Sequence, residues 1–121
     1  MSALTGKRIL LVEDEFVVAA MAEDMLTELG ATVIGPANTI AIGLRLAEAA
    51  TIDAAVLDVN MDGERIDPVA QVLSARGIPI VFATGYGDGA LGRTHEALIL
   101  DKPYTQEQLA NALARALNVL R

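Results

Sequence analysis

The sequence predicts a doubly wound α/β fold, in which helices cover both faces of a five-stranded parallel sheet. Short apolar runs, too short for helices and mostly rich in β-branched residues, alternate along the chain with segments of helical periodicity. The length of 121 residues is close to that of one domain with one core. We therefore expect a single domain over residues 1–121, with no output domain.

Five apolar runs are predicted to be buried strands. They are residues 8–12 (RILLV), 31–34 (ATVI), 54–57 (AAVL), 79–83 (PIVFA) and 98–100 (LIL). Most of them lie beside Gly, Pro or a polar residue, as strands do. The last run has three residues, and its assignment rests mainly on its place in the alternation.

Helical patterns fill the segments between these strands. The predicted helices cover residues 15–29, 39–50, 67–75 and 89–97, and a last helix has an apolar stripe from residue 109 to residue 120. Gly30 is a natural C-terminal residue after the first helix, and Asn38 is the candidate N-cap of the second. Thr105 and Gln108 form a candidate capping box before the last.

Composition limits the classes of function. The formal net charge of −7 repels phosphates, so no nucleic-acid or anionic-membrane partner is expected. Without cysteine there is no disulfide framework or Cys-ligated zinc, and no signal-type segment or membrane span is evident, so a cytoplasmic location is expected. Aromatic residues are scarce. Met21 and Met25, four residues apart on the first predicted helix, are expected to fill the core of the domain.

Polar residues directly follow most of the predicted strands. They are Glu13 and Asp14 after the first strand, Asp58 after the third, Thr84 after the fourth, and Asp101 and Lys102 after the fifth. In open α/β sheets the ligand crevice lies at the carboxyl ends of the strands. These residues therefore predict a functional site at one edge of the sheet.

The residue types predict phosphoryl transfer assisted by Mg²⁺. Clustered carboxylates stay ionised together when a cation compensates them, and oxygen ligands at a partly open site suit Mg²⁺. Asp58 is the natural nucleophile, because a carboxylate can form an acyl phosphate. Glu13 and Asp14 would hold the metal, Lys102 would balance the phosphate charge, and Thr84 would donate its hydroxyl.

Each of these residues also has an ordinary structural explanation. An aspartate after a strand is often an N-cap or a turn residue, and a strand-end threonine is more often structural than a ligand. Lys102-Pro103 alone is a common loop dipeptide, and the only histidine, His95, is expected on a surface helix. The combination decides the interpretation, because independent turn residues are not expected to occur in this set and order.

Over essentially its whole length the sequence resembles the receiver domains of two-component response regulators. The resemblance rests on Glu13-Asp14 in LLVEDE, Asp58 closing AAVLD, Thr84 in VFATG, and Lys102-Pro103 in LDKPY. It implies a sheet with strand order 2-1-3-4-5, and Mg²⁺-dependent transfer of a phosphoryl group from a kinase phosphohistidine to Asp58. By the same resemblance, the metal ligands would be Asp14, Asp58 and the backbone carbonyl of Asn60, with Glu13 acting mainly through water. The peptide bond before Pro103 would be cis.

Two departures from the usual receiver pattern stand out. Ile99 occupies the place of the aromatic residue that usually acts as a switch with the threonine, and the loop 60–64 replaces a Pro-Gly-rich segment. With Phe-Ala-Thr-Gly at residues 82–85, these features resemble the "FAT GUY" receivers, whose implied partners are histidine kinases of the HWE type and its close relatives. As a hypothesis, Tyr86 or Tyr104 takes over part of the aromatic role, and the loop 85–89 becomes ordered on phosphorylation.

The leading interpretation is a stand-alone receiver, not an enzyme beyond its own phosphorylation and slow dephosphorylation. It would bind a histidine kinase and a histidine phosphotransfer protein or another downstream protein, as a monomer or as a weak phosphorylation-dependent dimer. One alternative is a small Mg²⁺-dependent phosphohydrolase, which typically needs a second acid where this chain has Asn60. Another is an adaptor that acts without phosphorylation, although Asp14, Asp58 and Lys102 are all present.

Overall fold

The computed structural model describes residues 3–85 and 98–118, and within them lies a five-stranded parallel sheet. Its strands are β1 (Arg8–Val12), β2 (Thr32–Ala37), β3 (Ala54–Asp58), β6 (Ile80–Thr84) and β7 (Leu98–Asp101). They lie in the order β2-β1-β3-β6-β7, and every pair is parallel. With the two short strands β4 and β5 left out, this is the predicted order 2-1-3-4-5, which is therefore confirmed.

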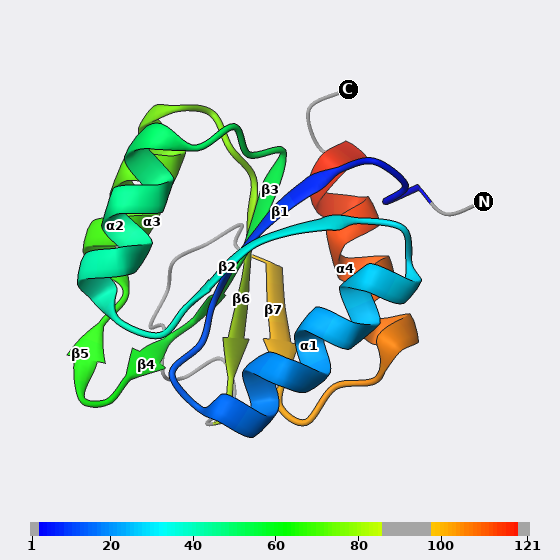
Figure 1. Ribbon diagram of the computed structural model, residues 1–121, viewed down its shortest axis with the longest axis horizontal. Coiled ribbons are helices and arrows are strands. Elements are labelled where there is room, and N and C mark those ends of the chain that lie inside the picture. Colours follow the sequence, from blue (N-terminus) through cyan, green and yellow to red (C-terminus); the bar gives the residue numbers. More distant parts are fainter. Residues whose placement is uncertain (1–2, 86–97, 119–121) are drawn as a thin grey trace.

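Helices cover both faces of this sheet (Figure 1). The helices α1 (Phe16–Glu28) and α4 (Gln106–Asn118) pack on one face, and α2 (Ile40–Ala49) and α3 (Asp67–Ala75) on the other. Side chains alternate between the faces of a strand, so β1 contributes Leu11 to the first core layer and Leu10 to the second. The predicted helix 89–97 lies outside the described residues.

A short antiparallel hairpin, not predicted from the sequence, follows β3. It consists of β4 (Asn60–Met61) and β5 (Glu64–Arg65), joined by a turn at Asp62-Gly63. Both turn residues have positive φ, 53° and 84°, a conformation in which Asp and Gly are well tolerated. The side chain of Met61 is buried in the core between the sheet and α2 and α3, so the hairpin is fixed to the domain.

The predicted helix ends are largely confirmed. Gly30 follows α1 with φ 87°, and the capping box before α4 is present, with the Thr105 hydroxyl accepting from the Gln108 backbone and the Gln108 side chain accepting from the Thr105 backbone. The prediction of Asn38 as the N-cap of α2 is wrong. Thr39 has that place, and its hydroxyl accepts from the backbone N–H of Ile42.

Part of the apolar surface of α1 faces outward. Met25 packs against the core as predicted, but the assignment of Met21 to the core is wrong, because its side chain is largely exposed. Ala22 and Leu26 mark the centre of the buried stripe, and Met21 lies about 100° around the helix from Ala22. Among the described residues, no helix is long and apolar enough to cross a membrane.

Candidate functional site at the carboxyl ends of the strands

Most of the residues that follow the strands meet around one cavity. Glu13 and Asp14 follow β1, Asp58 ends β3, and Thr84 ends β6. Lys102 follows β7, and its backbone N–H donates to the carbonyl of Thr84 over 2.8 Å. The cavity, of about 480 Å³, is lined by Asp14, Asp58, Thr84 and Lys102 together with Glu15, Asn60, Asp62, Gly63 and Gly85. Asp101, at the end of β7, is exposed and does not line it.

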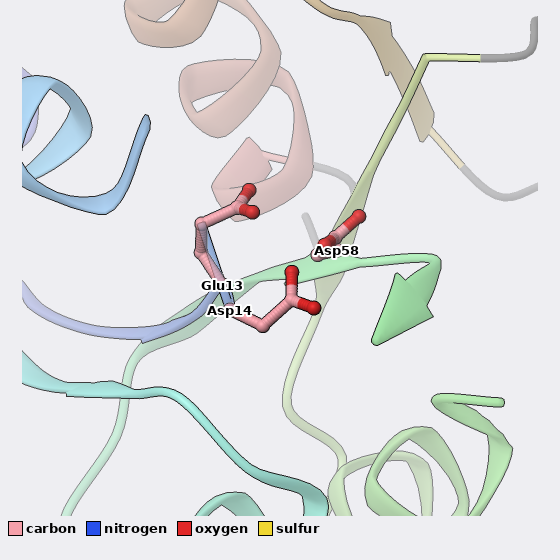
Figure 2. Close-up of side chains that lie close together, drawn as sticks. All are labelled: Glu13, Asp14 and Asp58. Carbon is pink, nitrogen blue, oxygen red and sulfur yellow. The ribbon is translucent and has the colours of Figure 1, made fainter. Parts of the chain in front are cut away.

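Three carboxylates gather at the ends of the neighbouring strands β1 and β3 (Figure 2). Glu13, Asp14 and Asp58 each offer one oxygen, and these oxygens lie within 4.8 Å of one another. Glu13 and Asp58 are buried, whereas Asp14 is half-buried. Three acids this close repel one another unless positive charge compensates them.

Lys102 supplies positive charge to this group of acids. Its Nζ lies 3.2 Å from Glu13 Oε1 and 3.3 Å from Asp58 Oδ1, so it bridges the two buried acids. It also lies 3.5 Å from Oε1 of Glu15, an exposed residue that was not among the predicted site residues. The available signal was position, because Glu15 directly follows the acidic pair and precedes the first helix.

Burial and repulsion change the acidity of the central carboxyl group. Burial, reinforced by the charge of Glu13, raises the pKa of Asp58 from 3.8 to about 7, even though Lys102 acts against this rise. Burial alone would lower the pKa of Lys102, but the charges of Glu13 and Asp58 outweigh it and raise that pKa above its ordinary value. One ammonium group therefore does not fully compensate the acids.

The chemistry of this donor set fits a divalent cation. Asp14 and Asp58 present oxygen ligands at the wall of an open cavity, which is the environment that Mg²⁺ prefers. Asn60 lies beside them, with its backbone N–H 3.4 Å from Asp58 Oδ1 and its side-chain oxygen accepting from Gly63 over 3.2 Å. The turn thus holds Asn60 at the site.

The residues proposed for switching lie in different environments. Thr84 is buried at the end of β6, and Ile99 is half-buried within β7. Tyr104 is buried and lines a groove together with Lys102, and burial together with the charge of Glu13 raises its pKa to about 12. Tyr86 and the rest of the glycine-rich loop, apart from Gly85, lie outside the described residues. The Lys102–Pro103 peptide bond is cis, as expected, and so is Gly35–Pro36.

The profile described as "Response regulator receiver domain" matches residues 9–114. The chain belongs to the receiver domain family of response regulators. Receivers are signalling domains of two-component systems. They take phosphoryl groups from histidine kinases and bind Mg²⁺ at an acidic pocket. This membership supports the prediction that the chain is not an enzyme of the phosphohydrolase type.

Two curated relatives match the receiver over nearly its full length. It is 31% identical to the transcriptional regulatory protein PdtaR of Mycobacterium tuberculosis, with 98% of the chain and 60% of PdtaR covered. It is 28% identical to the phyllosphere-induced regulator PhyR of Methylorubrum extorquens, with 97% of the chain and 46% of PhyR covered. The chain thus spans about half of the length of these relatives.

A solved structure has a length close to that of the receiver. SdrG from Sphingomonas melonis Fr1 is 48% identical, with a TM-score of 0.82 and with 97% of this chain and 99% of SdrG covered. A BeF₃-activated conformation of SdrG is 47% identical over the same shares of the two chains, with a TM-score of 0.78. The fold class predicted from the sequence is shared with these structures.

Proposed function

We propose that this chain is a single-domain response regulator that accepts a phosphoryl group from a histidine kinase on Asp58 and thereby changes its binding to partner proteins. The observation that carries the proposal is the contact of Lys102 with the buried acids Asp58 and Glu13, at a cavity that Lys102, Asp58 and Asp14 line. The likeness to SdrG over nearly its full length supports a receiver that acts as a single domain over residues 1–121.

In the proposed reaction, an oxygen of Asp58 attacks the phosphorus of a phosphohistidine in line with the bond that breaks. The P–N bond is cleaved, the imidazole leaves, and an acyl phosphate forms on Asp58. Lys102 would move from the Asp58 carboxylate to a phosphoryl oxygen, a short displacement because the two groups are already 3.3 Å apart. The Thr84 hydroxyl would donate a hydrogen bond to another phosphoryl oxygen.

Asp14, Asp58 and the backbone carbonyl of Asn60 would hold Mg²⁺, with Glu13 acting through water. When bound, Mg²⁺ would neutralise negative charge on the phosphoryl oxygens. Glu13 also accepts hydrogen bonds from Lys102 and from the backbone of Glu15, at 3.2 Å and 3.1 Å. Its second role would therefore be to hold Lys102 in the site.

For switching, we propose that Thr84 is coupled to Tyr104, or to Tyr86 in the glycine-rich loop, because Ile99 has no aromatic ring. Tyr104 is the better supported of the two. It follows Lys102 by two residues, is buried, and lines a groove of about 300 Å³ that also includes Lys102 and Gly85, the neighbour of Thr84. Movement of Lys102 toward a phosphoryl group would therefore change the surroundings of the Tyr104 ring.

The proposed partners follow from the receiver assignment and the Phe-Ala-Thr-Gly sequence at residues 82–85. Membership of the "FAT GUY" subgroup would imply a sensor kinase of the HWE type or a close relative. A histidine phosphotransfer protein or another downstream protein would read the phosphorylated state. The setting would be cytoplasmic, with a monomer or a weak phosphorylation-dependent dimer. The formal charge of −7 supports protein partners over nucleic acid.

The test is intact-mass measurement after incubation with acetyl phosphate, with and without Mg²⁺. We expect one phosphoryl adduct that forms with Mg²⁺ and is absent from the Asp58→Asn variant. The variant Asp101→Asn is a matched control, since Asp101 ends β7, two strands away from β3 in the sheet, and is exposed; it should be phosphorylated like the wild type. An adduct that persists in Asp58→Asn would refute the assignment of Asp58.

A further inference from the structure

Glu15 occupies the mouth of the site. Its carboxylate lies 3.5 Å from Lys102 Nζ, and its side chain is 65% exposed, against 2% and 5% for Glu13 and Asp58, the other two acids on the same ammonium group. Glu15 and Lys102 line both the acidic cavity and the adjoining apolar groove. Glu15 is therefore the carboxylate that an incoming molecule meets between solvent and Lys102.

The described wall of the cavity is strongly negative. Asp14, Glu15, Asp58 and Asp62 contribute carboxylates to it, and Lys102 is the one basic residue among its described lining residues. A phosphoryl donor is itself an anion and must approach Lys102 through this field. Repulsion by charges at the mouth of a cleft lowers the rate at which small anions enter it.

Glu15 contacts Lys102 but has no role in the proposed chemistry. It is not among the proposed metal ligands, and it is not the phosphoacceptor. Its side chain makes no capping hydrogen bond for α1, although the residue occupies the N-cap position. Its side chain forms an ion pair with Lys102. Removing its charge should therefore leave the fold and the buried acids in place.

We propose that Glu15 is a specificity-determining residue that discriminates against small anionic phosphoryl donors. The inference rests on the proposed function, because it concerns the donors from which Asp58 accepts its phosphoryl group. Glu15 acts in two ways. Its negative charge repels the donor, and its carboxylate competes with the donor's phosphoryl oxygens for Lys102. Both effects slow phosphorylation by small donors.

The test compares initial rates of phosphorylation of the wild type and Glu15→Gln by intact mass, at low ionic strength, with Mg²⁺ and limiting donor. Acetyl phosphate, a dianion near neutral pH, is one donor, and phosphoramidate, a monoanion, is the other. We expect Glu15→Gln to react about two- to fivefold faster with acetyl phosphate, with a smaller gain for phosphoramidate. High salt should reduce the gain, since it screens exposed charges.

The matched control is Glu28→Gln, which removes the same charge from an exposed position at the other end of α1, about 20 Å away along the helix. Its rate should stay close to that of the wild type. Equal or slower reaction of Glu15→Gln, or an equal gain in Glu28→Gln, would overturn the inference while leaving the phosphoacceptor role of Asp58 intact. Absence of any adduct on both the wild type and Glu15→Gln would instead overturn the proposed function, and this inference with it.

Discussion

The Asp58 carboxyl group is buried beside a second buried acid, Glu13, and its pKa is raised to about 7. A nucleophilic carboxylate must be ionised, so the same burial that shields the site from water also opposes the reactive form of Asp58. Positive charge resolves this conflict, and Lys102 provides part of it at 3.3 Å. The negative charge that Lys102 leaves uncompensated is the electrostatic reason to expect a divalent cation at this site.

The raised pKa of Asp58 predicts a pH dependence of stability in the metal-free protein. Between about pH 4 and pH 7 the folded protein binds more protons at this group than the unfolded chain, so its free energy of unfolding falls as the pH rises through that window. In Asp58→Asn this contribution is lost, and we expect the variant to exceed the wild type at pH 8 by about 1 to 3 kcal/mol. Urea unfolding of the two proteins in EDTA at pH 5 and pH 8 measures the pH dependence of the wild type and the stability difference at pH 8.

The control for this prediction is Asp24→Asn, which removes an exposed carboxylate from α1. It should show the same pH dependence as the wild type. If Asp58→Asn lost no more of that dependence than Asp24→Asn, burial would not be what sets the acidity of Asp58.

Single residues of the site could be predicted from their positions after apolar runs. Asp58 follows an apolar run that is recognisable by itself, whereas the run before Asp101-Lys102 is indicated mainly by its place in the alternation. The parallel arrangement of the strands brings these ends to one edge. Glu15 could not be assigned in this way, because its contact with Lys102 depends on how the first turn of α1 meets the residue after β7. The relative placement of these two segments is set by tertiary packing and not by the local sequence.

Among the helices, the capping box before α4 gives a direct test of local structure. Thr105 and Gln108 exchange two hydrogen bonds, at 3.1 Å and 2.8 Å, in which each side chain accepts from the backbone N–H of the other residue. Two backbone donors at the helix start are thereby satisfied. We expect Thr105→Ala to lower the free energy of unfolding by about 1 kcal/mol. Thr27→Ala, at an exposed threonine within α1, should have a much smaller effect in the same urea titration. Equal losses would mean that the cap contributes nothing specific.

The elements differ in how strongly the sequence determines them. The segments 8–12 and 67–75 match β1 and α3 residue for residue, since apolar periodicity and flanking breakers agree there. The hairpin of β4 and β5 was missed because two-residue strands have no periodicity, although Asp62-Gly63 is a typical hairpin turn. Asn38 and Thr39 are both residue types that cap helices. The backbone angles decide which of them is the N-cap of α2, and the sequence does not show these angles.

For the molecule as a whole, the acidic edge predicts stabilisation by Mg²⁺. A ligand that binds the folded state adds about 1.4 kcal/mol at ten times its dissociation constant, enough to raise the melting temperature by several degrees. We expect this rise for the wild type and most of it to be lost in Asp14→Asn, because Asp14 is an oxygen donor at the cavity wall. Differential scanning calorimetry with MgCl₂, against NaCl at equal ionic strength, measures it. Equal rises in both proteins would place the ion elsewhere.

The ion pair between Lys102 and Glu13 joins residues 89 positions apart in the chain, and Lys102 follows the outermost strand of the described sheet. β7 pairs with β6 along one side, so it can open in a local fluctuation while β1 and β3 stay paired. During such an opening the two buried acids lose their ammonium partner although the domain remains folded. We therefore expect local opening of this edge strand to set how often Lys102 leaves the two acids, and amide hydrogen exchange in β7 measures that opening.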